Sequence, residues 1–448
     1  MNEISFSSTL SGRKLTSTVT VPKGLRKYFN SFKLLAYYDA PLKADKSILD
    51  IPFVSNVLPL AWLTGTDVHV EKLDKKYVEA MNAIKHEFNL MYPRGRFTTK
   101  IIVDDLVENQ TRSQETALLF SGGVDSTYSL IRNISLKPRL IMFSGVQHYQ
   151  LDPSYKRYEQ LVRETYSAFA KRQGLGINFI ETNIIGILND SRISHDFYKT
   201  LRGTGLWLGL QFPLTLLGLP APLSIGRFNR LLIAASVDPK HDYNKYPHSS
   251  QPRIDEKFAW ADLRVMHHGY IHRFSKTSLI VEYLKKNELY LKVCNKPPPN
   301  RLNCSACEKC LRTAAPLVLE GIDPNNCGFD LNSTTFRSMR SLLERKKTDA
   351  LVVDSFWKTL QTLIPQEMKT NLYGSKDFFM WLKNLNIESA RRKRNFYKDL
   401  FNSLPYNLAL LFDAFCHSAQ KSLFRAINRS ADPWSFFLQS IRSSLNRR

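Results

Sequence analysis

The chain has 448 residues, which is enough for two or three domains with a sizeable buried core. Its hydrophobic content of 43% and aromatic content of 12% exclude wholesale disorder, collagen-like chains and coiled-coil fibres. Lysine and arginine total 63 against 40 aspartate and glutamate residues, which gives a formal charge of +23. The composition therefore predicts a basic globular protein.

The opening residues MNEISFSSTLSG give no sign of an export signal, because Glu3 stands where a signal peptide is basic and no apolar segment follows. We therefore expect a cytoplasmic protein whose six cysteines are reduced or metal-bound. The 24 residues between Arg202 and Arg227 carry no charge, but three prolines interrupt them. They predict a buried helix that runs into a core strand, and no membrane span.

Residues 1–110 predict a small α+β domain. Alternating apolar patterns predict strands at Ile4–Leu10, Leu15–Val21, Phe32–Tyr38, Asp67–Val70 and Thr98–Val103. A helical pattern covers Asp74–Tyr92.

Residues 111–335 alternate apolar runs with amphipathic stretches, which predicts an α/β fold with a doubly wound parallel sheet. The predicted strands lie at Ala117–Phe120, Leu140–Phe143, Ile177–Ile180 and Leu231–Ala235, and a predicted helix covers Tyr155–Gln173. Residues 336–448 predict a basic helical domain. Its helical spacing is seen at Val353, Phe356, Leu360 and Leu363 and over Leu408–Ile427 and Trp434–Leu445.

A glycine-rich turn follows the strand predicted at residues 117–120, and an amphipathic helix follows the turn. The turn consists of Ser121, Gly122, Gly123, Val124, Asp125, Ser126 and Thr127. Strand, glycine turn and helix start together predict a phosphate cradle, because backbone amides, hydroxyl groups and the helix dipole all favour an anion there. Asp125 fits a cradle in which it helps to hold Mg²⁺ on a pyrophosphate group, or it caps the helix. An ordinary serine and glycine turn is the alternative.

At these residues the chain resembles the PP-loop ATP pyrophosphatases, whose motif SGGxDS ends the first strand. The resemblance implies a fold of the PP-loop/HUP type with bound ATP and Mg²⁺. It implies cleavage of ATP between the α and β phosphates, adenylation of a substrate oxygen, and attack on the activated carbon by ammonia, an amine or a sulfur donor. All seven turn residues would then bind ATP, and Asp125 and Ser126 would belong to the catalytic machinery.

Four cysteines form the pattern C-x9-C-x2-C-x2-C, namely Cys294, Cys304, Cys307 and Cys310. Four thiolates at this spacing predict a tetrahedral Zn²⁺ site that is structural, because no position is open for water. Disulfides are disfavoured without an export signal, whereas an iron–sulfur cluster stays open as an alternative. We expect Cys327 and Cys416 to be small buried hydrophobic residues.

The turn, the cysteine cluster and Arg312 together resemble one branch of the family, the 7-cyano-7-deazaguanine synthases, over about residues 111–335. In that branch a carboxylate on 7-deazaguanine is adenylated, amidated and dehydrated to a nitrile. The segment DYNKYPHSSQPRIDEKF is similar to the branch's substrate segment YSGYPDCRPEF. Lys276 stands where the branch has a phosphate-side lysine, which implies a catalytic role. A solvated surface lysine is the alternative.

The substrate segment also departs from the branch, since His248 replaces an aspartate, Gln251 replaces an arginine, and one residue is inserted. The departures predict a different set of substrate contacts. Its candidates are Tyr246, His248, Ser250, Gln251 and Asp255. Asp255 is alternatively the N-cap of the next helix. His148 is a further candidate at the end of the second parallel strand, although a lone histidine is more often a packed loop residue.

Residues 337–448 hold 20 basic and 9 acidic residues. The basic run at residues 391–394 precedes Phe396 and Tyr397, a pattern that favours nucleic-acid phosphates but also fits a solvated helix face or an anionic protein partner. Stand-alone synthases of the branch lack such domains. The extra domains therefore favour an acceptor or a substrate larger than ammonia and a free base, such as a protein or a nucleic acid.

Taken together, the residues and the resemblance predict an ATP-dependent carbon–nitrogen ligase. It would adenylate a carboxylate on a 7-deazaguanine-like heterocycle and pass the acyl group to ammonia or an amine, with no membrane partner. One alternative is a tRNA-thiolating PP-loop enzyme with an iron–sulfur cluster. Another is a zinc-containing nucleic-acid-binding protein that only senses ATP. Relatives of the branch occur in queuosine biosynthesis and in phage defence.

Overall fold

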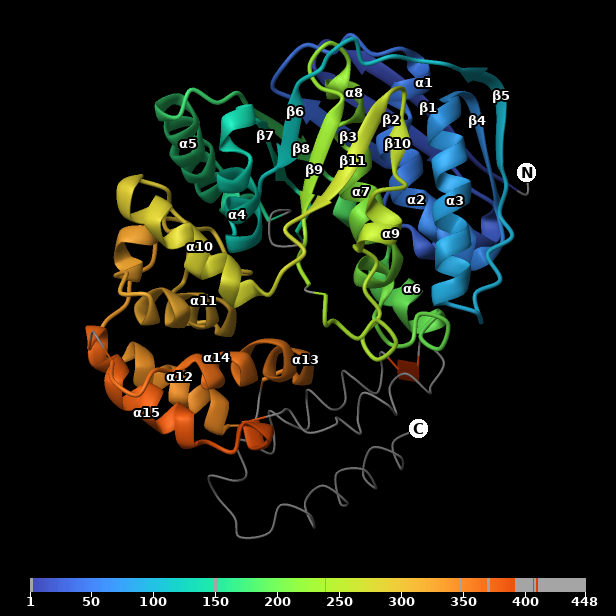
Figure 1. The fold of residues 1–448 in the computed structure, drawn as a ribbon. Helices are drawn as coiled ribbons and strands as arrows, with labels where there is room; N and C mark the ends of the chain where they lie inside the picture. The colour runs from blue at the N-terminus through green and yellow to red at the C-terminus, as the bar shows by residue number, and fades with distance from the viewer. Residues whose placement is uncertain are drawn as a thin grey trace. The chain divides into compact units, whose positions relative to one another are not determined.

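The computed structural model describes residues 3–390, apart from 148–151, 238, 346–347 and 369–370, and it also describes residues 406, 408 and 409. The chain divides into two compact units, residues 1–393 and 394–448. Figure 1 draws the chain, and the helices and strands labelled in it belong to the first unit. The predicted helices over residues 410–427 and 434–445, Cys416, and the basic run at 391–397 lie outside the described residues.

Eleven strands form one sheet, in the order β10-β11-β9-β6-β7-β8-β3-β2-β1-β4-β5. Their bounds are Glu3–Ser11 (β1), Lys14–Thr20 (β2), Lys33–Tyr38 (β3), Asp67–Asp74 (β4), Ile101–Val107 (β5), Thr116–Leu119 (β6), Arg139–Ser144 (β7), Ile177–Thr182 (β8), Arg230–Ala234 (β9), Ala259–Trp260 (β10) and Leu263–His268 (β11). Every strand that the alternating patterns predicted is present, although β5 begins three residues later than expected.

The middle of the sheet is parallel, since β11, β9, β6, β7 and β8 run in one direction. β3 pairs antiparallel with β8 through Ala36 and Thr182, so the N-terminal strands extend the same sheet. β1, β2 and β3 are antiparallel neighbours, and β4 and β5 continue in parallel with β1. The protein is therefore α/β with a large, mostly parallel sheet, as predicted.

Both faces of the sheet are covered, because consecutive residues of β6 enter different hydrophobic cores. Ala117 and Leu119 belong to a core that also contains Ile4 and Trp62, whereas Leu118 belongs to a second core. A strand buried on both faces is expected to be apolar at every position, as β6 is. Residues 1–110 thus share one core with the strands that follow them. The division of the chain at residues 110 and 335 remains a prediction.

Fifteen α-helices occur among the described residues. They are Lys46–Leu49 (α1), Ile51–Thr64 (α2), Lys75–Met91 (α3), Val124–Arg132 (α4), Lys156–Arg172 (α5), Asp190–Asp196 (α6), Phe212–Gly218 (α7), Ala221–Ser224 (α8), Pro252–Asp255 (α9), Arg273–Lys286 (α10), Glu308–Leu319 (α11), Thr335–Glu344 (α12), Ala350–Val352 (α13), Lys358–Leu363 (α14) and Ser375–Asn384 (α15). Short 3₁₀ or π segments are Lys23–Tyr28 (η1), Ile134–Leu136 (η2), Pro153–Tyr155 (η4), Ile184–Gly186 (η5), Trp207–Gln211 (η6), Pro324–Cys327 (η7), Val353–Trp357 (η8), Leu372–Gly374 (η9) and Ile387–Ala390 (η10).

α3 and α2 show why one helix was predicted and the other was not. α3 is amphipathic and begins where the Asp74 side chain accepts a hydrogen bond from Tyr77 N at 3.0 Å. α2 is buried at every position except its last, Thr64. A helix that is apolar all round carries no period of 3.6 residues, so its pattern gives no helical signal.

The uncharged stretch 203–226 folds as three short helices, η6, α7 and α8, followed by β9. Pro213 lies in the first turn of α7 and Pro222 in the first turn of α8, where proline needs no hydrogen-bond donor. The stretch is buried and runs into a core strand, as predicted, but as several helices. No helix among the described residues has the length and apolar content needed to cross a membrane.

The helices from α12 to α15 form a third hydrophobic core with one face of α11. Val353, Phe356 and Leu360 are buried in it, as their spacing predicted, whereas Leu363 is 44% exposed. This core belongs to the first compact unit.

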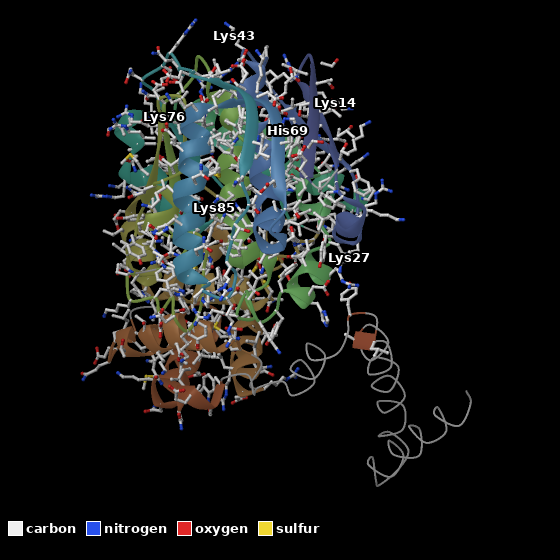
Figure 2. The ribbon with its side chains drawn as sticks, turned by 90° about the vertical axis from the view of Figure 1, so that its right-hand side faces the viewer. Lys14, Lys27, Lys43, His69, Lys76 and Lys85 are labelled. Atoms are coloured by element: carbon white, nitrogen blue, oxygen red, sulfur yellow. The ribbon has the colours of Figure 1, made fainter. Side chains whose placement is uncertain are left out.

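Part of the positive charge lies on the N-terminal half of the fold. Figure 2 shows Lys14, Lys27 and Lys76 on this surface, and all three side chains are exposed. Lys85 instead bends back and donates to Thr99 O at 2.6 Å. The excess charge is therefore not confined to the C-terminal quarter of the chain.

Candidate functional site

The turn between β6 and α4 has a backbone that only glycine fits. Gly122 has φ 76°, in the left-handed region, and a Cβ atom there would lie 2.1 Å from Tyr166 Oη. Tyr166 is buried, and its hydroxyl donates to Tyr290 O at 2.9 Å, so the ring is held in place. Gly123 is the N-cap of α4, and no side chain caps this helix. The first N–H groups of α4 therefore remain able to donate to an anion.

Two serine hydroxyls stabilise the turn. Ser121 Oγ lies 3.1 Å from Ser126 Oγ, which accepts from Ser121 N at 3.2 Å, and Gly123 N donates to Ser121 Oγ at 3.2 Å. Val124 is buried in the core and the Thr127 side chain is fully buried. Any contact that these two residues make to a ligand would therefore come from the backbone.

Asp125 lies in the first turn of α4 and is bound to two cations. Its carboxylate oxygens lie 2.9 Å from Arg273 Nη1 and 2.9 Å from Lys276 Nζ, and the Asp125 side chain is 18% exposed. Burial alone would raise the pKa of Asp125, but the charges of Arg273 and Lys276 outweigh it, so the pKa is lowered. The expectation that Asp125 caps the helix is wrong, because the N-cap is Gly123.

Lys276 lies in the first turn of α10 and is 1% exposed. Its ammonium group donates to Asp125 and also to Ala235 O, directly after β9. A solvated surface lysine, the alternative weighed above, is therefore excluded. The structure brings Lys276 to the turn, although Lys276 reaches Asp125 and does not line the cavity described next.

A cavity of about 760 Å³ lies at the carboxyl ends of β6, β7 and β9. Three groups of side chains line it, namely Ser121, Asp125 and Ser126 from the turn, the polar residues Lys292, Asn295, Lys296 and Lys309, and apolar residues that include Trp207, Leu208, Phe212 and Leu216. In an open α/β sheet, ligands bind outside the carboxyl ends of the strands where the strand order reverses, which here is beside β6. The cavity occupies that position.

Basic groups predominate around the turn. The basic side chains in electrostatic contact with this site are Arg273, Lys276, Lys292, Lys309 and Arg312. The carboxylates that interact with them are Asp125, Glu159 and Glu308. Burial and the neighbouring arginines lower the pKa of Lys309 to about 8, and burial also lowers the pKa of Lys292. These five cations act beside the three carboxylates and beside the thiol of Cys307, so the side of the cavity next to the turn is rich in basic groups.

The four predicted cysteines converge. The Sγ atoms of Cys294, Cys304, Cys307 and Cys310 all lie within 4.8 Å of one another. Closest pairs are 3.4 Å (Cys307 to Cys310), 3.8 Å (Cys304 to Cys310) and 3.9 Å (Cys294 to Cys307). Four thiolates at tetrahedral positions about 2.3 Å from Zn²⁺ would be about 3.8 Å apart. The cluster could therefore hold a metal ion such as zinc. Cys327 is buried outside it, as expected.

The five residues predicted to contact substrate lie behind one wall of the cavity, and none of them is among the described residues that line it. Ser249 N donates to Leu208 O at 2.9 Å, and the rings of His248 and Phe212 are 6.0 Å apart, so the segment packs on η6 and α7. Burial lowers the pKa of His248 to about 4. Tyr246 Oη donates to Asp354 at 3.4 Å.

Asp255 belongs to a buried polar cluster. Asp255 Oδ2 accepts from Ser250 Oγ at 2.7 Å and lies 2.7 Å from His267 Nδ1, and the side chains of Asp255 and His267 have no exposed surface. Burial raises the pKa of Asp255. The alternative that Asp255 is an N-cap is wrong, since it ends α9, whose N-cap is Gln251. Gln251 donates to His248 O at 3.0 Å.

The sequence analysis did not predict some of the residues at this site, and one predicted residue cannot be placed. His148 is outside the described residues. Arg273, Lys292 and Lys309 were not predicted, although each lies within three residues of a predicted site residue, namely Lys276, Cys294 and Cys310 respectively.

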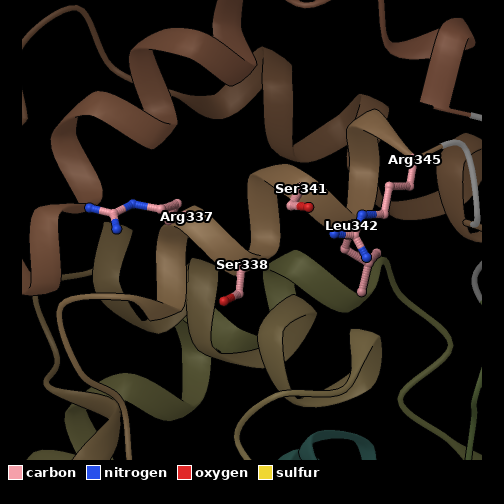
Figure 3. Close-up of a pocket in the computed structure, with 5 residues that line it drawn as sticks. All are labelled: Arg337, Ser338, Ser341, Leu342 and Arg345. Atoms are coloured by element: carbon pink, nitrogen blue, oxygen red, sulfur yellow. The ribbon is translucent and has the colours of Figure 1, made fainter. Parts of the chain in front are cut away.

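A second hollow, of about 490 Å³, lies along α12. Figure 3 shows the residues that line it, Arg337, Ser338, Ser341, Leu342 and Arg345. Four of them lie on α12 and Arg345 follows it directly, so within the described part of the chain no second element converges on this hollow. The cavity at the strand ends is therefore the better candidate for a ligand site.

Comparison of the chain with protein-family models, with curated proteins and with solved structures gives no match.

Proposed function

We propose that the protein is an ATP-dependent ligase of the PP-loop type, which splits ATP into AMP and pyrophosphate and activates a carboxylate for attack by ammonia or an amine. The parallel strand order β11-β9-β6-β7-β8 is compatible with the doubly wound fold of that type. The turn at residues 121–127 lies where such a fold binds phosphate.

The lysine-rich lining of the cavity beside the turn is the observation that carries the proposal. Three lysines line the cavity, namely Lys292, Lys296 and Lys309. Of the two carboxylates that line it, Asp125 is already bound to two cations, so the lining suits a polyanion better than a neutral ligand. The cavity volume of about 760 Å³ lies in the range of small-molecule sites. Trp207 and Phe212, which also line the cavity, offer aromatic surface to a heterocycle. A nucleotide has this combination of polyanion and heterocycle.

The proposed reaction proceeds in two steps. A carboxylate oxygen of the substrate attacks the α phosphorus, the bond from that phosphorus to the bridging oxygen breaks, and pyrophosphate leaves. The amine nitrogen then attacks the acyl carbon and AMP leaves with the bonding electrons, while the amine proton passes to solvent. The N–H groups of α4, Ser121, Ser126 and the neighbouring cations would neutralise the pyrophosphate as it departs.

Magnesium would enter with the nucleotide. Each carboxylate oxygen of Asp125 already lies 2.9 Å from a cation, so Asp125 offers no preformed Mg²⁺ site. Mg²⁺ in proteins is commonly bound through substrate phosphates and water. Asp125 would then orient Arg273 and Lys276 at the turn, and Mg²⁺ would be bound chiefly by ATP.

For the cysteine cluster we favour Zn²⁺ because of the sulfur spacing, with an iron–sulfur cluster as the rival that an absorption spectrum in the visible range would reveal. The substrate class, a 7-deazaguanine carboxylate, depends on the resemblance of residues 243–252 alone. A protein or nucleic-acid acceptor depends on the basic residues after 336.

The test is a reaction of the purified chain with Mg-ATP and 7-carboxy-7-deazaguanine, with and without ammonium, analysed by mass spectrometry. Formation of AMP and pyrophosphate with an amide or nitrile product is expected. Ser126→Ala should slow the reaction strongly, whereas Ser338→Ala, an exposed serine on α12, should leave it unchanged. ATP that binds and stays intact in every mixture would favour an ATP-sensing protein instead.

A further inference from the structure

The metal centre and the cavity share a segment of the chain. Lys292 lies two residues before Cys294, Asn295 lies directly after Cys294, and Lys309 lies directly before Cys310. All three side chains line the same cavity as Ser121 and Ser126 of the turn. The two lysines therefore reach the cavity from positions next to metal ligands.

This segment has no regular structure of its own. No helix or strand occurs between residues 287 and 307, all of which are described. It is held instead by hydrogen bonds to other parts of the chain and within itself, since Lys292 N donates to Gly122 O at 2.7 Å and Cys294 N donates to Asn303 Oδ1 at 3.2 Å. Leu289, Leu291 and Val293 anchor it in the second hydrophobic core, and between these anchors its shape depends on cross-links. A metal ion bound to all four cysteines would be the strongest such cross-link.

A hydrogen bond between two cavity-lining residues also joins the two stretches of chain that carry the cysteines. Lys309 Nζ donates to Asn295 Oδ1 at 3.1 Å, which joins α11 to the segment that carries Cys294. Arg273 and Lys276 are already bound to Asp125 and do not line the cavity. Three lysines line the cavity, and Lys296 is exposed whereas Lys292 and Lys309 are partly buried. Lys292 and Lys309 are therefore the cations best placed to meet a phosphate group beside the turn.

We infer that Lys292 and Lys309 form an anion subsite for the terminal phosphates of a nucleotide, and that metal binding by the cysteine cluster sets this subsite in place. The inference rests on the proposed function, because it deepens the nucleotide site named there. The metal would then control ligand affinity, in addition to stabilising the fold. Lysine suits this role, since its ammonium group acts as a point charge towards phosphate.

The test measures binding by calorimetry, with inorganic pyrophosphate, ATP and adenosine as probes and the zinc-loaded full chain as the protein. Lys292→Gln and Lys309→Gln should each weaken pyrophosphate binding about tenfold and leave adenosine binding unchanged. Lys285→Gln is the matched control, because Lys285 is an exposed lysine paired with Glu282 on α10. Zinc content is measured for every variant, so that a lost metal is not mistaken for a lost contact.

The second part of the test removes the metal. Chelation of the wild type should weaken pyrophosphate binding about as much as the double variant Lys292→Gln/Lys309→Gln does, and chelation of the double variant should weaken it little further. Added zinc should restore the wild type. Zinc-loaded lysine variants with wild-type affinity would overturn the subsite, and metal-free wild type with full affinity would overturn the dependence on metal. A wild type that binds neither ATP nor pyrophosphate would instead refute the proposed function itself.

Discussion

Replacement of Asp125 by asparagine tests how the turn is stabilised. The Asp125 carboxylate binds Arg273 and Lys276, and the Lys276 side chain is only 1% exposed. Asparagine keeps the size of the side chain but removes the charge, so a buried ammonium group loses its counterion. Removal of one partner from a buried ion pair costs about 3–5 kcal/mol. We expect Asp125→Asn to lower the free energy of unfolding by that amount.

Two further variants separate the buried charge from other effects. Asp330→Asn breaks an ion pair with Arg301 in which both side chains are more than half exposed, and it should cost less than about 1 kcal/mol. Asp125→Asn/Lys276→Met removes the unpaired charge as well and should recover most of the lost stability.

The assay is urea denaturation at pH 7, followed by tryptophan fluorescence and by far-ultraviolet circular dichroism. Agreement of the two probes supports a two-state analysis. Equal unfolding free energies for Asp125→Asn and Asp330→Asn would refute the reasoning. The expected result has a practical consequence, because loss of activity in an Asp125 variant alone would not establish a catalytic role.

Three other predictions concern the same region. The pKa of Asp125 is lowered in the folded chain, so its contribution to stability should be fully present above about pH 5 and lost as the pH falls through the folded pKa. The difference in unfolding free energy between wild type and Asp125→Asn should therefore shrink only in acid. A difference that stays constant with pH would contradict this. Gly122→Ala should destabilise the protein by more than the roughly 1–2 kcal/mol of a left-handed alanine, because its Cβ would meet Tyr166. Gly321→Ala, with the same φ and no atom within 4 Å, is the control in thermal denaturation, and equal losses would contradict the clash. Cys304→Ser should reduce bound zinc well below one ion per chain in metal analysis, whereas Cys327→Ser, outside the cluster, should retain the zinc. Unchanged zinc in Cys304→Ser would exclude Cys304 as a ligand.

Local signals in the sequence were sufficient for the turn and the cysteine cluster. Strand, glycine turn and helix follow one another directly between residues 116 and 132, and three of the four cysteines lie within seven residues. Their geometry depends on short-range backbone preferences, which a pattern in the sequence carries. α3 was predicted for the same reason, since its cap and its amphipathic period are both local.

The features that the sequence did not predict depend on contacts between residues far apart in the chain. Arg273 reaches the turn because α10 packs against α4, and Lys292 because its backbone N–H donates to Gly122 O. The predicted residues Lys276 and Cys294 lie close to them in the sequence, but no local pattern indicates that these two side chains meet the turn. β3 joins the sheet beside β8, which is 139 or more residues away, so residues 1–110 share a core with the next region. The segment at 241–255 contained the expected polar residues, but burial in the fold turned Ser250 and Asp255 towards each other.

The most direct test of the central claim is whether the protein converts ATP to AMP and pyrophosphate when a carboxylate is present. Mass spectrometry of the zinc-loaded chain with Mg-ATP, 7-carboxy-7-deazaguanine and ammonium should detect AMP and pyrophosphate in equal amounts, together with a heterocycle whose carboxylate has become an amide or a nitrile. Bound ATP that remains intact, or that yields ADP and phosphate, would contradict an adenylating ligase.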